Sequence, residues 1–269
     1  MGRAIKIAGC GCSLADFLYT GVDFTGNAFQ SFRSKQLGDG GLNPGALVFM
    51  SDLERFTGCT PDAIVQRLAG NRAPDAMNVG GPAVVALVQA AQLLSSGLDG
   101  KDNNISDVPP SVPPHAGGRQ RSCVMYCGAM GNDEAGGKIR GILEQTPLDI
   151  SHYITVDEPS PSTIVLSDPA YDGGHGERCF INTIGASDTY GPDNLPDEFS
   201  RADIALFGAT ALVPQLHDNL TTLVEKAKAA GCVTVVTTVF DFRNEALNPG
   251  SRWPLGDTAR TLKATDLFI

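Results

Sequence analysis

Three short stretches of the sequence carry residues that suit ligand binding: GCSLAD at 11–16, NVGG at 78–81 and VFDFR at 239–243. Asp16 and Asp241 each follow an apolar segment that predicts a strand, at the edge where open α/β sheets bind their ligands. A carboxylate in that place accepts hydrogen bonds from neighbouring hydroxyls, which suits a sugar or another polyol. The alternative for Asp16 is an aspartate that forms a turn or a cap, and the alternative for Asp241 is ordinary ion pairing within a loop.

Gly80 and Gly81 directly precede an apolar stretch that predicts a helix over 82–96. The first N–H groups of a helix have no partner within it, and residues without side chains let a hydroxylated ligand reach them. The alternative is a tight strand-to-helix turn that needs a positive φ. Arg243, two residues after Asp241, offers a guanidinium fork that matches phosphate oxygens, with loop ion pairing as its alternative.

Other chemistries find little support in the sequence. Gly9 and Gly11 form a G-x-G, but Leu14 replaces the third glycine of a dinucleotide fingerprint. The sequence contains no G-x-S-x-G and no Walker A stretch, and its seven cysteines form no C-x-x-C pair. These patterns argue against an NAD enzyme, a serine hydrolase, a P-loop kinase and a zinc site.

The surrounding elements alternate between apolar strands and helices, which predicts a doubly wound, mostly parallel sheet. Helices are expected from Ser51, with a capping box to Glu54, from Thr60 as N-cap to Gly70, and after Asn132 as N-cap. A single helix is expected over 214–230, strands near 152–156, 162–167 and 178–184, and a disordered insertion over 98–120, which holds His115.

Composition narrows the class of protein. The formal net charge is −10 without a Lys/Arg cluster, so a nucleic-acid footprint is not expected. The odd cysteine count and the absence of a secretory signal predict reduced thiols in a cytoplasmic protein. No apolar run reaches the roughly 18 residues that span a membrane.

Taken in order, these motifs resemble the ribokinase-like superfamily of carbohydrate and nucleoside kinases. GCSLAD resembles its first-strand motif, NVGGPAVVALVQAAQLL its Gly-Gly signature, and YCGAMGNDEAGGKIRGILEQ its G-x-x-G-x-D-x-x-G stretch. AKAAGCVTVVTTVFDFRNE resembles the helix-strand pair that ends in an aspartate loop. The resemblance extends over nearly all 269 residues.

This resemblance implies an ATP- and Mg²⁺-dependent kinase that phosphorylates a hydroxyl of a sugar or nucleoside. It implies one α/β domain over 1–269 with a small β-sheet lid from segments about 14–50 and 152–184. On its basis we assign two groups of site residues. The substrate-binding group is Asp16, Gly41, Gly80, Gly81 and Glu177, and the phosphate-side group is Asp241 and Arg243. No metal ligand is assigned, and the ALVFM segment at 46–50 is a possible dimer edge.

Two features depart from the family pattern. Val85 stands where the family usually has an asparagine that contacts the substrate. The family's glycine-rich loop, which supplies the catalytic base, is expected beyond Ile269, so the chain looks cut at its C-terminus and inactive alone. The competing hypothesis is a non-catalytic sugar- or nucleoside-binding protein of the same fold.

Overall fold

The computed structural model describes residues 5–95, 124–239, 241–248, 250 and 254–269. Its larger sheet is wholly parallel, with the strand order β11-β10-β9-β1-β5-β6. These strands are β1 (Ile7–Gly11), β5 (Val124–Gly131), β6 (Asp149–Val156), β9 (Ile204–Gly208), β10 (Val233–Thr237) and β11 (Leu267–Phe268). The predicted α/β class with a mostly parallel sheet is therefore confirmed.

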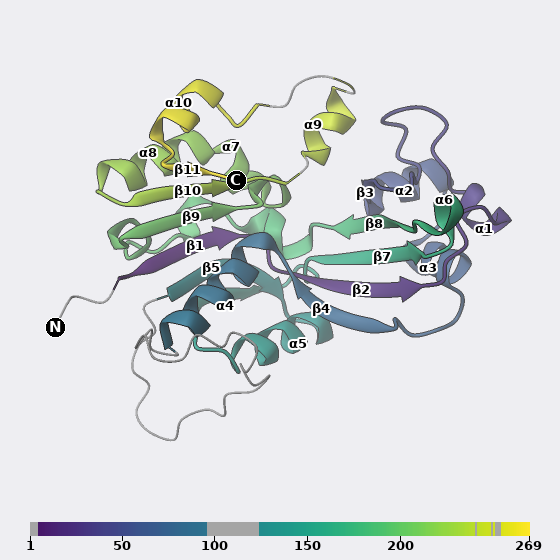
Figure 1. Cartoon of the computed structure of the whole chain (residues 1–269), viewed down its shortest axis with the longest axis horizontal. Coiled ribbons are helices and arrows are strands. Elements are labelled where there is room, and N and C mark those ends of the chain that lie inside the picture. The colour runs from purple at the N-terminus through teal and green to yellow at the C-terminus, as the bar shows by residue number, and fades with distance from the viewer. Residues whose placement is uncertain (1–4, 96–123, 240, 249, 251–253) are drawn as a thin grey trace.

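Helices cover both faces of this sheet (Figure 1). One layer contains α4 (Pro82–Ser95) and α5 (Glu134–Leu143), and the other contains α7 (Pro214–Asp218), α8 (Leu220–Ala229) and α10 (Thr258–Ala264). The strands are apolar on both sides because each face is buried. On β9, for example, Ala205 and Phe207 pack toward the α7–α8 side and Leu206 toward the α4 side.

A second sheet extends from one end of the first, at the right of Figure 1, with the order β3-β8-β7-β2-β4. Its strands are β2 (Leu14–Thr20), β3 (Leu47–Phe49), β4 (Ala76–Gly80), β7 (Ser162–Asp168) and β8 (Glu177–Thr183). A cluster of buried aromatic and aliphatic residues joins one face of this sheet to α1 (Asn27–Gln30), α2 (Met50–Thr57) and α3 (Pro61–Ala69). The other face carries the polar residues considered below.

The chain passes from the large sheet to the second sheet within two residues, Cys12 and Ser13, which separate β1 from β2. Two tyrosines fasten this crossing. Tyr126 donates its hydroxyl to the Gly11 carbonyl at 2.8 Å, and Tyr153 donates to Ser13 Oγ at 3.2 Å. The two rings also meet edge to face at 5.4 Å, so β5 and β6 hold the start of β2 in place.

Several predicted element boundaries are confirmed. Thr60 caps α3 by accepting from the Ala63 N–H, and the helix ends at Gly70. Helix α4 begins at Pro82, directly after the paired glycines. The described cysteines are free thiols, and all but Cys59 are buried, as expected for small core residues.

Three predicted helix features and one predicted sheet assignment were wrong. Helix α2 starts at Met50 rather than Ser51 and has no side-chain cap, because the chain enters it directly from β3. Asp133, not Asn132, caps α5, and its carboxylate also accepts from the Ser160 backbone at 2.7 Å. The helix expected over 214–230 is broken at Asn219 into α7 and α8.

The fourth difference concerns the predicted lid. The strand that includes residues 152–156 is β6, which pairs with β5 in the large sheet rather than with the second sheet. Its place is taken by β4, which pairs antiparallel with β2. The predicted insertion at 98–120, including His115, lies outside the described residues.

Within the described residues, no helix is both long enough and apolar enough to cross a membrane.

Candidate functional site

Asp16 lies in the middle of a polar row that crosses the second sheet. The strand pairing places it opposite Asn78 of β4 on one side and Thr163 of β7 on the other. Thr163 in turn lies opposite Asn182 of β8. Because directly paired residues project from the same face of a sheet, these four side chains form one continuous strip on the face turned away from α1–α3.

The Asp16 carboxyl is partly buried, and burial raises its pKa to about 6, while a hydrogen bond from Thr163 lowers it. Removal from water disfavours the charged form of a carboxyl group, and a donor directed at the carboxylate favours it. Burial outweighs the single donor here. The structure therefore holds a half-buried acceptor with little protein charge to neutralise it.

Gly80 lies against this acceptor, and Gly81 lies against the backbone of Cys12 and Ser13. A Cβ on Gly80 would overlap Asp16 Oδ2, so only glycine leaves room for the carboxylate there. Gly81 adopts φ +113°, and a Cβ on it would overlap the Cys12 carbonyl oxygen. The close approach that demands two glycines is thus made by the protein's own groups, which bring Asp16 to the start of α4.

No motif in the sequence points to Thr163 or Asn182, which also lie in this row. Both are buried, at 4% and 2% exposure, and Asn182 donates from Nδ2 to Thr163 Oγ1 at 3.0 Å. Asn182 Oδ1 has no hydrogen-bond partner. The signal in the sequence is weak, namely polar residues at inward positions of the alternating strands 162–168 and 177–183. Only the strand pairing shows that the two residues meet beside Asp16.

Glu177 lies elsewhere on the second sheet. It is exposed at the start of β8 and pairs with Asp168, five residues along β7 from Thr163. At the usual rise of about 3.3 Å per residue, that is about 16 Å from the Asp16 row. The register thus separates Glu177 from Asp16 and from Gly80 beside it.

Gly41 has a reason within its own loop. Its N–H donates to Asp39 Oδ1 at 2.9 Å, and a Cβ on Gly41 would press against the backbone of Ser34. This packing requires a glycine without any ligand.

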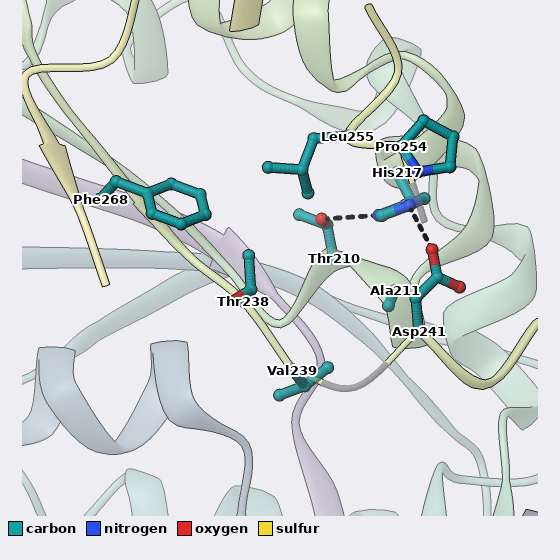
Figure 2. A pocket seen from close by; sticks show the side chains of 9 residues that line it. All are labelled: Thr210, Ala211, His217, Thr238, Val239, Asp241, Pro254, Leu255 and Phe268. Carbon is teal, nitrogen blue, oxygen red and sulfur yellow. Dashed lines mark hydrogen bonds and ion pairs between the residues drawn. The ribbon is translucent and has the colours of Figure 1, made fainter. Parts of the chain in front are cut away.

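A second polar cluster lies at the carboxyl edge of the large sheet, where a pocket of about 400 Å³ opens (Figure 2). Asp241 and His217 line it and are each 7% exposed in their side chains, with His217 Nε2 3.1 Å from Asp241 Oδ2. This contact does not meet hydrogen-bond geometry. His217 Nδ1 lies 3.1 Å from the Thr210 hydroxyl, which fixes the ring from its other side.

Asp241 is the N-cap of α9 (Phe242–Leu247), four residues beyond the end of β10. Its Oδ1 accepts from the Asn244 N–H at 3.1 Å and its Oδ2 from Asn244 Nδ2 at 2.6 Å. Both oxygens are thus occupied by protein groups. These contacts describe a helix-capping aspartate better than a free ligand acceptor, and the sequence did not predict the cap.

Arg243 is paired with another residue, Asp218, through Nη2, and its buried Nη1 has no hydrogen-bond partner. Its Nη2 bonds both carboxylate oxygens of Asp218, at 3.1 and 3.2 Å. The two phosphate-side candidates therefore belong to separate interactions. In the described part of the chain, no group of three or more His, Cys, Asp or Glu residues is arranged to hold a metal ion.

Several solved kinase structures have a fold similar to that of this chain. Adenosine kinase from Anopheles gambiae, in complex with P1,P4-di(adenosine-5) tetraphosphate, matches with a TM-score of 0.63 at 13% identity over 99% of this chain. Ribokinase from Arabidopsis thaliana, complexed with ribose and ATP, matches with a TM-score of 0.55 at 14% identity over 99% of the chain. The chain has the ribokinase-like fold.

Other matches agree with this fold. Adenosine kinase from Schistosoma mansoni, in complex with adenosine, matches with a TM-score of 0.59 at 11% identity. The ribokinase-like chain spans about 60% of the length of these solved structures, 63%, 60% and 61% in the order given. No protein-family model matches the sequence, and no curated protein matches it either.

Proposed function

We propose that this chain binds the acceptor substrate of an ATP-dependent kinase that phosphorylates a hydroxyl of a sugar or nucleoside. The observation that carries the proposal is the half-buried Asp16 carboxylate, held against Gly80 at the start of α4 within a ribokinase-like fold. Its oxygens suit a pair of neighbouring hydroxyls. The similar solved structures carry ribose or adenosine, which are the first compounds to test.

The described residues do not fit ATP with Mg²⁺. Asp241 has both oxygens occupied, Arg243 is paired with Asp218, and no cluster of metal ligands is present among the residues described. We therefore assign no step of phosphate transfer to this part of the chain. ATP and Mg²⁺ remain predictions that rest on the likeness to longer kinases.

The binding proposal is tested by titrating D-ribose and adenosine into residues 1–269 in a calorimeter. We expect one of them to bind and Asp16→Asn to weaken that binding at least tenfold, because the substitution removes the charge and one acceptor oxygen, and a hydrogen bond to a charged group typically contributes about 2 kcal/mol. Asp172→Asn is the matched control, because Asp172 is exposed and its φ of +51° suits asparagine. Equal loss in both variants, or binding that ignores Asp16, contradicts the proposal.

The second candidate is a binding protein of this fold without kinase activity, favoured by the poor fit of the described residues to ATP and Mg²⁺. A phosphate-transfer assay with labelled ATP separates the two. We expect the chain of 269 residues to fall far below the roughly 1 per second of typical kinases. Transfer at that rate would show that this chain holds its own catalytic and nucleotide groups. A cytoplasmic location and a dimer through β3 also stay predictions.

A further inference from the structure

We propose that Thr163 and Asn182 are positioning residues that hold the Asp16 carboxylate in one orientation through a chain of hydrogen bonds across β8, β7 and β2. The inference rests on the proposed function, because the oriented carboxylate is the acceptor that the substrate hydroxyl would meet. Strand pairing places Asn182 opposite Thr163 and Thr163 opposite Asp16, so the three side chains lie in sequence along one row.

The number of available protons fixes the direction of this chain. A threonine hydroxyl has one proton, and the Asp16 carboxylate, directly opposite Thr163 across β2 and β7, is the acceptor to which we assign it. Its oxygen must then accept from its other neighbour, and Asn182 Nδ2 donates to it at 3.0 Å. Asn182 therefore turns its Oδ1 away, and that buried atom is left without a partner. Buried polar atoms are nearly always paired, so this unpaired oxygen marks an amide held in place for its N–H.

The carboxylate is confined on its other side as well. Asp16 Oδ2 lies where the side chain of any residue other than glycine at position 80 would be. Thr163 on one side and the bare Gly80 Cα on the other restrict rotation about the Cβ–Cγ bond of Asp16. The result is an acceptor whose lone pairs point in a fixed direction before a ligand arrives, which lowers the entropic cost of binding.

Few other charges act on Asp16. The thiol of Cys12, at the end of β1, is the group that couples to it electrostatically. Of the elements packed against β2, strand β7 carries Asp168 at its far end. Helix α5 carries Glu134 and Lys138, which pair with each other, and Arg140, which donates to the Tyr153 carbonyl. Strand β4 has no titratable side chain. The pKa of Asp16 therefore reports mainly on its burial and on Thr163.

The test is carbon-13 NMR of the 269-residue chain with labelled aspartate carboxyl groups, titrated from pH 4 to 9. Asp16→Asn identifies the Asp16 signal. We expect Thr163→Val to raise the Asp16 midpoint by about 0.5 to 1 pH unit, because the carboxylate loses its donor. Thr163→Ser keeps a hydroxyl and is expected to restore the midpoint. Asn182→Leu, one step further along the row, is expected to raise it by a smaller amount.

Thr183→Val is the matched control, because Thr183 follows Asn182 on β8 and projects from the opposite face. It is expected to leave the midpoint unchanged. An unchanged midpoint in folded Thr163→Val, or no recovery with serine, overturns the proposal. If Thr163→Val does not fold, Asn182→Leu decides, and an unchanged midpoint there also overturns it.

The titration needs no ligand, so its outcome is separate from that of the proposed function. If D-ribose and adenosine both fail to bind while the midpoints shift as expected, the positioning row stands and the proposed function fails. If a compound binds, Thr163→Val is expected to weaken binding more at pH 6 than at pH 8. The substitution raises the pKa of Asp16, so at pH 6 the carboxyl of the variant is largely protonated. Equal weakening at both pH values assigns Thr163 a structural role only.

Discussion

Asp16 and Asp241 are two partly enclosed aspartates near the ends of β-strands, and they are satisfied in different ways. Asp241 has each oxygen bonded by Asn244 and one oxygen also close to His217. Asp16 has the Thr163 hydroxyl as its hydrogen-bond donor and a pKa raised by burial. A carboxylate accepts about four hydrogen bonds, so Asp16 retains acceptor capacity that Asp241 has largely used.

The difference shows that position at a strand end does not by itself identify a binding group. Both residues satisfy the same rule about the ligand edge of an open sheet. What separates them is the local chain. A helix begins directly after Asp241 and takes its oxygens as a cap, whereas Asp16 lies within a strand whose backbone bonds are made by β4 and β7. The available lone pairs decide which aspartate is a candidate for ligand binding.

The largest expected effect concerns the backbone that supports Asp16. We expect Gly81→Ala to lower the free energy of unfolding by about 3 kcal/mol or more, because φ is +113° and the new Cβ overlaps the Cys12 carbonyl. Urea denaturation measures the loss. Gly137→Ala is the control, since its Cβ meets nothing within 4 Å and alanine favours a helix interior. Similar losses in the two variants would mean that the Asp16 region does not depend on this close approach.

The next largest effect is expected at Asp241, whose two oxygens both accept hydrogen bonds. Asp241→Ala removes a helix cap and leaves the buried His217 without its acidic neighbour, so we expect a loss of about 2 kcal/mol. Urea denaturation again gives the value. Asp218→Ala, an exposed partner of Arg243, is expected to cost well under 1 kcal/mol. If the two losses are equal, Asp241 is not the structural residue that its contacts indicate.

Asp16→Asn is expected to change stability in the opposite direction. A carboxyl whose pKa is higher in the folded chain binds its proton more tightly there, so ionising it costs stability as pH rises from about 4 to about 6. Because Asp16 is partly exposed, solvent screening reduces this cost to about 1 kcal/mol. The variant should therefore unfold at a higher temperature than the native chain at pH 8 and at the same temperature at pH 4. A native advantage at pH 8 would contradict the raised pKa.

The smallest effect is expected at Arg243. Its bonds to Asp218 join two partly exposed side chains, and such ion pairs contribute about 0–1 kcal/mol. We expect Arg243→Gln to change the free energy of unfolding by less than about 0.5 kcal/mol at moderate salt. A double-mutant cycle with Asp218→Ala measures the pair directly. A large coupling energy would place Arg243 among the groups that organise the second cluster.

Local patterns predicted much of the fold and part of the site. The α3 caps at Thr60 and Gly70 and the glycine-led start of α4 are decided by neighbouring residues, so the sequence shows them. The break at Asn219 is not visible in this way, since the residues around it are all compatible with a helix. Membership of a sheet is decided by pairing between distant segments, which explains why β6 was placed in the lid and β4 was not predicted.

The same distinction applies to the candidate site. Asp16 and Gly80 were predicted together, and the structure brings them into contact. Thr163 and Asn182 were not predicted, because their position beside Asp16 depends on the register of three strands. Glu177 was predicted to lie in the site. It lies on β8, the strand that carries Asn182, but at the opposite end of that strand. Sequence motifs thus pointed to residues whose placement depends on nearby backbone, and missed residues whose placement depends on pairing between strands.

The two-residue crossing between β1 and β2 has a mechanical consequence. Cys12 and Ser13 are the point about which β2 could pivot relative to the large sheet. The hydroxyls of Tyr126 and Tyr153, bonded to Gly11 and Ser13, hold this point against the large sheet. Asp16 lies three residues along β2, while Thr20 lies at its tip. Any swing of the second sheet about the crossing would carry the tip through a wide arc and Asp16 through a short one. Because Asp16 lies so near the crossing, such a swing would move its carboxylate less than it would move Thr20.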